Sequence, residues 1–293
     1  MRAKSIISKV FNNSNLVQRR SFAVASQVQK NVVLELLKDS DEGVAVLSLN
    51  NTEQKNTFTR GLLDGLNENF QKIVKTNARV LILRSTVPKI FCAGANLKER
   101  LQMTDEEVRE FSNYSRATIT RLQFLPMPVI AALDGAALGG GLEMALACDI
   151  RISENNVKLG LVETRLAILP GAGGTVRLPR LINPALAKEL IYTARVFNGV
   201  EAKEMGIVSH VVEQNEEKNA AYLKSLDIAR EILPNGPVGV QMAKYAINKG
   251  LEVDINAALS FEEAAYSRII PTKDRIEGLK AFNEKRPPKY IGE

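Results

Sequence analysis

Ala131-Ala-Leu-Asp-Gly-Ala-Ala-Leu-Gly-Gly-Gly-Leu-Glu143 is the most informative segment of this 293-residue sequence. It begins inside an apolar run, 129–133, that is typical of a buried strand, and it leads into a short apolar helix expected over 142–148. Three consecutive glycines, Gly139, Gly140 and Gly141, lie between them. Because glycine lets a ligand approach the backbone and the first amides of a helix are unpaired, this turn is a candidate anion-binding site.

Glu143 is the only charged residue between Asp134 and Asp149. A helix this apolar is expected to be buried on most sides. A buried carboxyl without a partner raises its pKa and can exchange a proton near neutral pH. The alternative is a structural glutamate that is tied to a backbone amide or to an arginine.

A second carboxyl, Glu163, follows in Lys158-Leu-Gly-Leu-Val-Glu-Thr-Arg165. If it shares a pocket with Glu143, the two form a general acid–base pair. The alternative is a surface glutamate near Arg165. The turn Cys92-Ala-Gly-Ala-Asn96 offers another close approach to the backbone, and two converging amides would make an oxyanion hole. Both glycine-containing segments could instead be ordinary turns.

The remaining sequence alternates between strand and helix patterns. Strands are expected over 44–49, 80–84 and 149–153 and helices over 59–74 and 104–125, which together predict an α/β domain. From 184 to the end the pattern is almost entirely helical, as expected of a subdomain or an oligomer surface. We therefore predict a core over 32–225 and a helical C-terminal region over 226–293.

The composition excludes several classes of protein. Hydrophobic residues make up 45% and charged residues 25%, which is ordinary for a globular protein and excludes a disordered chain. No apolar run approaches the roughly 18–20 residues that span a bilayer, so no membrane insertion is expected. Cys92 and Cys148 are too few for a disulfide scaffold and are expected to be buried thiols. The single histidine, His210, argues against a histidine-dependent catalytic triad.

Residues 1–26 have the composition of a mitochondrial transit peptide, rich in arginine, lysine and serine and free of acids. The first 22 residues supply five of the six net positive charges, so the rest of the chain carries a net charge of +1. We therefore expect a protein of the mitochondrial matrix, with a disordered basic tail as the alternative. The nearly neutral body argues against a general polyanion binder.

Four strings, in order and at the right spacing, resemble the enoyl-CoA hydratase/isomerase (crotonase) superfamily. The resemblance covers about 32–293. It implies a ββα spiral core with helical C-terminal trimerisation, often paired into hexamers. It also implies an acyl-CoA substrate without a metal or a redox cofactor, since CoA is part of the substrate. The strings are Ile90-Phe-Cys-Ala-Gly-Ala-Asn-Leu-Lys98, the segment 131–143, Ala147-Cys-Asp-Ile-Arg151, and Gly160-Leu-Val-Glu163 with Pro170-Gly-Ala-Gly-Gly-Thr175.

The resemblance also implies a role for each site residue. Glu143 and Glu163 match the two catalytic glutamates of the hydratases, and the amides of Ala95 and Gly140 match the oxyanion hole. We expect Glu163 to supply the α-proton and Glu143 to take a proton from water. Many relatives have aspartate where this chain has Asn96, which leaves the amide of Ala95 available. Further substrate contacts are implied for Ala93, Gly94, Asn96, Leu97, Lys98, Gly139 and Gly141.

Strings such as Leu159-Gly-Leu-Val-Glu-Thr164 are similar to the subgroup that hydrates 3-methylglutaconyl-CoA to 3-hydroxy-3-methylglutaryl-CoA in leucine degradation. A second substrate carboxylate needs a cation, for which Lys98, Arg100 and Arg165 are candidates, although Lys98 could instead meet CoA phosphates. One alternative is a general short-chain enoyl-CoA hydratase of β-oxidation. The other is an AU-rich RNA-binding protein with secondary hydratase activity. In that subgroup RNA binding is assigned to a lysine-rich helix, but the matching segment 55–70 is about neutral here.

Overall fold

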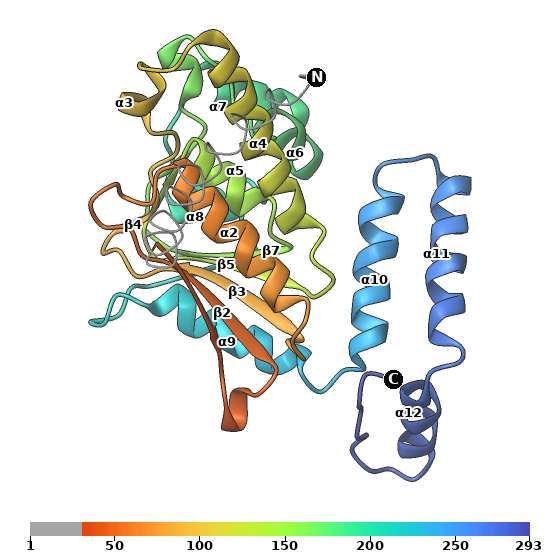
Figure 1. The fold of residues 1–293 in the computed structure, drawn as a ribbon. Coiled ribbons are helices and arrows are strands. Elements are labelled where there is room, and N and C mark those ends of the chain that lie inside the picture. The colour runs from red at the N-terminus through yellow and green to blue at the C-terminus, as the bar shows by residue number, and fades with distance from the viewer. Residues whose placement is uncertain (1–30) are drawn as a thin grey trace, which may run out of the picture.

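The protein, seen in a computed structural model, is described over residues 31–293, and the predicted transit peptide at 1–26 lies outside the described residues. Two β-sheets form the body (Figure 1). The large sheet has the strand order β1-β2-β3-β5-β7-β9 and the small sheet the order β4-β6-β8. β1 runs antiparallel to β2, and every other pair is parallel. The strands are β1 (Val32–Leu36), β2 (Val44–Leu49), β3 (Val80–Ser85), β4 (Ile90–Cys92), β5 (Val129–Leu133), β6 (Ala136–Leu138), β7 (Ile150–Glu154), β8 (Leu159–Gly160) and β9 (His210–Val212).

The chain passes repeatedly from the large sheet to the small one. β3, β5 and β7 lead into β4, β6 and β8, and helical segments follow each short strand. This repeat confirms the predicted ββα spiral core. The helical segments of the body are η1 (Asp39–Asp41), α2 (Arg60–Ile73), α3 (Leu97–Arg100), α4 (Asp105–Gln123), α5 (Gly140–Leu146), η2 (Glu163–Leu166), α6 (Gly174–Leu181), α7 (Pro184–Tyr192), α8 (Gly199–Glu204) and α9 (Ala220–Ile232).

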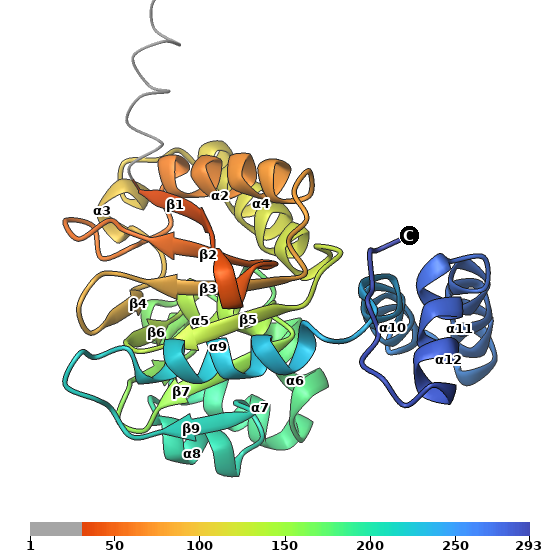
Figure 2. The ribbon, with the colours of Figure 1, turned by 90° about the horizontal axis from the view of Figure 1, so that it is seen from below.

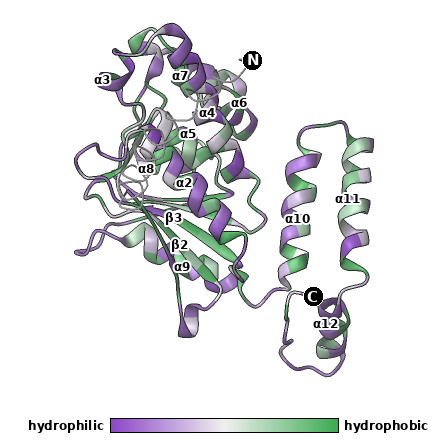
Figure 3. Ribbon diagram, in the orientation of Figure 1, coloured by the Kyte–Doolittle hydropathy of each residue, from purple (hydrophilic) through white to green (hydrophobic). Residues whose placement is uncertain are grey.

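Both faces of the large sheet are buried along β2, β3 and β5, which accounts for the continuously apolar character of these strands. In β2, Leu47 packs into the main core, whereas the neighbouring Val46 packs into a second core beneath α9. Figure 2 shows α9 on one side of the sheet and α2 with α4 on the other. In Figure 3, β2 and β3 are mainly green, the colour of hydrophobic residues.

Local signals place the two long helices of the body. Thr59 caps α2, since its hydroxyl accepts a hydrogen bond from the amide of Leu62. Thr104 and Glu107 form a reciprocal capping box at the start of α4. The predicted helices at 59–74 and 104–125 are therefore confirmed, as are the strands predicted over 44–49 and 129–133.

The C-terminal helices stand beside the body rather than on the sheet (Figures 1 and 2). They are α10 (Pro237–Gly250), α11 (Ile255–Ile269) and α12 (Lys273–Asn283). The predicted boundary between 225 and 226 falls inside α9, and the whole of that helix packs on the large sheet. Within residues 31–293, no helix is both long and apolar enough to cross a membrane.

One sequence expectation about this region is wrong. His210 to Val212 were expected within an almost entirely helical region, but they form β9, the edge strand beside β7. The physical reason is long-range pairing. Ile152 and Ser153 of β7 lie in register with His210 and Val211, so the open edge of the sheet gains one more parallel strand.

Candidate active site

The ends of three short strands bring the candidate residues together. β4, β6 and β8 are parallel neighbours, so their carboxyl ends lie at one edge of the small sheet. The turn with Ala95 follows β4, the glycine triplet follows β6, and Glu163 lies three residues after the end of β8. The amide of Gly139 donates to the carbonyl of Gly160 at 2.8 Å, which joins the last two segments directly.

The two candidate oxyanion amides lie on adjoining turns. A side chain added at Gly94 would come within 3.3 Å of the nitrogen of Gly140 and within 2.7 Å of the carbonyl oxygen of Leu138. Gly94 also has a φ of +90°, which favours glycine. Neither Ala95 nor Gly140 donates a turn or loop hydrogen bond from its amide to another backbone group within residues 31–293. Both amides therefore remain free to bind an oxygen from a ligand.

Glu143 lies on the buried helix α5, and only 2% of its surface is exposed. Its Oε1 accepts hydrogen bonds from the amides of Ala172 at 2.8 Å and Gly174 at 2.7 Å. Burial raises the pKa of this carboxyl, while these amides and the nearby arginines Arg177 and Arg100 oppose the rise. The backbone contact that we considered as a structural alternative is thus present, and it favours the ionised form of the carboxyl.

Glu163 begins the short helix η2, and only 9% of its surface is exposed. The alternative of a surface glutamate near Arg165 is therefore wrong. Its Oε2 is buried and accepts no hydrogen bond from residues 31–293. Burial, followed by the charge of Glu143, raises the pKa of Glu163 to about 7. Its Oε1 would lie 3.1 Å from a side-chain carbon added at Gly139, so the carboxyl faces the glycine triplet.

These contacts place both glutamates next to the glycine triplet. Glu143 is on the helix that begins at Gly140, and Glu163 contacts the residue before it. One carboxyl is supported by amides, and the other has a pKa raised to about 7, so that it can carry a proton near neutral pH. The arrangement can therefore supply a base, an acid and two anion-binding amides to one reacting group.

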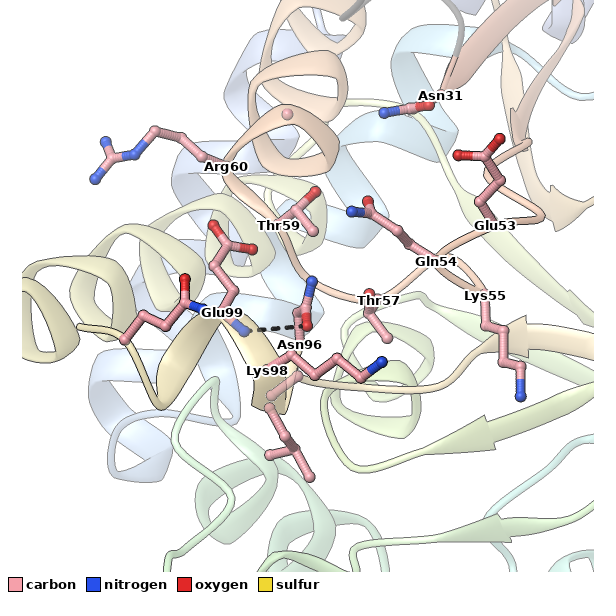
Figure 4. Close-up of a pocket in the computed structure, with 14 residues that line it drawn as sticks. Asn31, Glu53, Gln54, Lys55, Thr57, Thr59, Arg60, Asn96, Lys98 and Glu99 are labelled. Carbon is pink, nitrogen blue, oxygen red and sulfur yellow. Dashed lines mark hydrogen bonds between the residues drawn. The ribbon is translucent and has the colours of Figure 1, made fainter.

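A pocket of about 800 Å³ opens next to the turn with Ala95 (Figure 4). Its lining includes four residues of the predicted site, Ala95, Asn96, Leu97 and Lys98, and also Lys55 and Arg60. The size suits a large ligand and the cations suit an anionic one. The glycine triplet and both glutamates lie outside this lining, as do Ala93 and Gly94.

Asn96 caps the short helix α3. Its side chain accepts a hydrogen bond from the amide of Glu99 at 3.3 Å, drawn as a dashed line in Figure 4. Asparagine and aspartate are about equally good at this position, so the departure from the family pattern preserves the local structure. The buried thiols Cys92 and Cys148 have pKa values raised to about 12 by burial, in accord with the prediction for them.

Comparison with known proteins agrees with this geometry. The sequence pattern of the enoyl-CoA hydratase/isomerase family matches residues 39–293. The chain belongs to this family. It is 51% identical to human mitochondrial methylglutaconyl-CoA hydratase over 94% of this chain and 81% of that protein. It is 47% identical to mouse mitochondrial enoyl-CoA hydratase domain-containing protein 2 over 89% of this chain and 88% of that protein.

Solved enoyl-CoA hydratases share the fold. The crystal structure of the enzyme from Bacillus anthracis matches with a TM-score of 0.84 and 47% identity, over 90% of this chain and 100% of that chain. A second one, from Geobacillus kaustophilus, matches with the same TM-score at 30% identity, over 90% of this chain and 98% of that chain. The resemblance inferred from the four strings and the expectation of an enzyme of this family are confirmed.

Sequence reasoning missed the residues that support the site. The amides of Ala172 and Gly174 come from the Pro170–Thr175 string, which could have suggested a contact to one of the glutamates. Asn56 is completely buried, and its Nδ2 donates to Ser85 Oγ at 2.8 Å and to the carbonyl of Phe91 at 2.9 Å. It anchors the loop before α2 against β4, and no pattern in the sequence points to it.

Proposed function

We propose that the protein hydrates the α,β double bond of a short enoyl-CoA. The observation that carries this proposal is the meeting of two buried carboxyls with the amides of Ala95 and Gly140 at one edge of the small sheet. The thioester oxygen binds between the amides, which stabilise the enolate-like charge that develops on it. Oxyanion holes of this kind contribute on the order of several kcal/mol to the transition state.

The two carboxyls take different parts in the reaction. Glu143 takes a proton from water as the water oxygen bonds to the β-carbon, and Glu163 gives a proton to the α-carbon. The hydrogen bonds from Ala172 and Gly174 support this division, because they favour an ionised base at Glu143. A pKa of about 7 at Glu163 leaves a proton available there at neutral pH. All of the required charges come from the chain's own side chains and amides.

The substrate that we propose is 3-methylglutaconyl-CoA, which hydration converts to 3-hydroxy-3-methylglutaryl-CoA in leucine degradation. The similarity to human methylglutaconyl-CoA hydratase, at 51% identity over 94% of this chain, supports this choice. The CoA phosphates would lie toward the open pocket, where Lys55, Arg60 and Lys98 supply positive charge.

The proposed location is the mitochondrial matrix. The human and mouse relatives are named mitochondrial, and residues 1–22 are basic and free of acids. RNA binding is not proposed, because α2 balances Arg60 and Lys72 with Asp64 and Glu68. A basic groove with exposed aromatic side chains would be needed to favour single-stranded RNA.

A panel of enoyl-CoA thioesters tests the proposed function. We expect the highest kcat/KM for 3-methylglutaconyl-CoA and a lower, measurable value for crotonyl-CoA. A preference for crotonyl-CoA would instead favour a general short-chain enoyl-CoA hydratase. If the protein hydrated none of these thioesters, the proposal would be contradicted.

A further inference from the structure

The glutaconyl end of the proposed substrate creates an electrostatic problem inside the site. In 3-methylglutaconyl-CoA, one methylene separates the β-carbon from a second carboxylate. In the proposed reaction, Glu143 acts through water on that β-carbon and Glu163 on the neighbouring α-carbon, so the second carboxylate brings a third acidic group close to two others. Burying this charge without a cation would be costly. The site therefore needs a positive group close to the two glutamates.

Two of the three cations that the sequence suggests make contacts away from Glu143 and Glu163. Lys98 is exposed and lines the open pocket beside Ala95. Arg165 is exposed, and its Nη2 donates to the carbonyl of Ala194 at 3.0 Å. Neither contact directs the charge toward the two carboxyls.

Arg100 is turned toward the interior. It ends α3, and the carbon at the centre of its guanidinium group lies 5.7 Å from the centre of the buried Phe111 ring. Its Nε is buried and has no hydrogen-bond partner among residues 31–293. Its charge lowers the pKa values of both Glu143 and Glu163, so it lies close enough to influence the pair. A buried donor without a partner calls for an explanation, and a ligand would supply one.

The other arginine near the pair has its donors occupied. Arg177 donates from Nε to Gln123 at 2.9 Å and from Nη1 to the carbonyl of Ala172 at 2.9 Å. It thereby holds the loop whose amides bind Glu143, and it has little capacity left for a ligand. Arg100 is thus the arginine near both glutamates that retains a free buried donor.

We infer that Arg100 binds the second carboxylate of a dicarboxylic acyl chain and gives the site its preference for such substrates. The inference rests on the proposed function and deepens it. A guanidinium group presents donors in a planar fork that matches a carboxylate, and such charge-assisted pairs are stronger than neutral hydrogen bonds. Lys98 is left free for the phosphate side of CoA.

The test measures the ratio of kcat/KM for 3-methylglutaconyl-CoA to kcat/KM for crotonyl-CoA. In Arg100→Met, which removes the charge, we expect this ratio to fall about 100-fold, the scale for loss of one partner of a buried charge pair. Arg100→Lys keeps the charge without the fork and should lower the ratio less. The matched variant Arg165→Met should leave the ratio unchanged. Circular dichroism establishes that each variant is folded.

The outcomes separate this inference from the proposed function. If Arg100→Met loses activity on both substrates equally, or if neither Arg100 variant changes the ratio, the assignment of Arg100 is wrong. Should Arg100→Met not fold, an unchanged ratio in Arg100→Lys has the same meaning. If the unaltered protein hydrates crotonyl-CoA but not 3-methylglutaconyl-CoA, the proposed substrate fails before any variant is made.

Discussion

Glu143 and Glu163 are both buried carboxyls, but their surroundings differ. Two amides bind Glu143, whereas Oε2 of Glu163 has no partner within residues 31–293. Burial and the charge of Glu143 raise the pKa of Glu163 from its ordinary 4.5 to about 7. The folded protein therefore holds a proton that the unfolded chain releases at a lower pH. A group with a raised pKa of this kind lowers the stability of the native state once the unfolded chain ionises.

Glu163→Gln should remove this pH dependence of stability. As the pH rises from about 4.5 to about 7, ionisation of the unfolded chain costs the native protein stability, and the whole penalty is present above about pH 7. Glutamine does not ionise, so we expect the variant to be more stable than the unaltered protein at alkaline pH and similar to it at acidic pH. Urea unfolding across this range measures the difference. Glu110→Gln, at an exposed position, serves as the control. If the stability of Glu163→Gln changed with pH in parallel with that of the unaltered protein, the account would be refuted.

Among the elements, the small sheet depends on close backbone approach. A side-chain carbon added at Gly141 would lie 2.2 Å from the carbonyl oxygen of Cys92, so α5 packs directly on the backbone of β4. Backbone cannot move aside as a flexible side chain can. Gly141 of the glycine triplet therefore serves packing, as does Gly140, where an added carbon would lie 2.9 Å from the Phe58 ring.

Gly141→Ala should separate α5 from β4 and destabilise the protein by at least about 1–3 kcal/mol, the usual cost of overpacking. Gly61→Ala is the matched control, because its added carbon would lie 3.8 Å from its nearest neighbour. That variant should stay within about 1 kcal/mol of the unaltered protein. Thermal and urea unfolding measure both. Equal stability of the two variants would show that the β4–α5 contact is not tight.

The sequence predicts the elements that carry their own periodicity and misses those that depend on neighbours. The strand predicted over 129–133 and the helix over 59–74 were found because an apolar run or an amphipathic face is a local property. β8 has two residues and β9 has three, too few for any period, and both exist through pairing with distant strands.

The same distinction holds in the site. The two glutamates stand out as charges in apolar surroundings, and the glycines mark the turns. Arg100 points inward because it contacts Phe111 of the next long helix. Asn56 anchors its loop through the carbonyl of Phe91, which lies on a later strand. No local pattern records such contacts.

At the scale of the whole molecule, the C-terminal helices expose apolar side chains that the described body does not cover. The green segments on α10 and α11 in Figure 3 mark hydrophobic residues of these helices. Exposed apolar surface of this kind is typical of an interaction surface. The exposed residues include Ile247, Leu251, Ile255, Leu259, Leu279 and Phe282.

We predict that these helices assemble trimers or hexamers. Leu251→Asp combined with Ile255→Asp should shift the protein toward a monomer, because assembly would bury both charges without partners. Sedimentation velocity measures the change. Val74→Asp, an exposed apolar position at the end of α2, should leave the assembly intact. A monomeric unaltered protein at micromolar concentration would contradict the prediction.

The central claim is that Glu143 and Glu163 act together on one bound enoyl-CoA. The most direct test is kcat for hydration by Glu143→Gln, Glu163→Gln and the double variant, with acyl-CoA binding measured alongside. The account predicts that each single variant binds acyl-CoA but loses about 10²-fold or more in kcat. It also predicts that the double variant loses less than the product of the two single losses, because residues that act as a unit are not additive. Near-normal turnover in either single variant would contradict it.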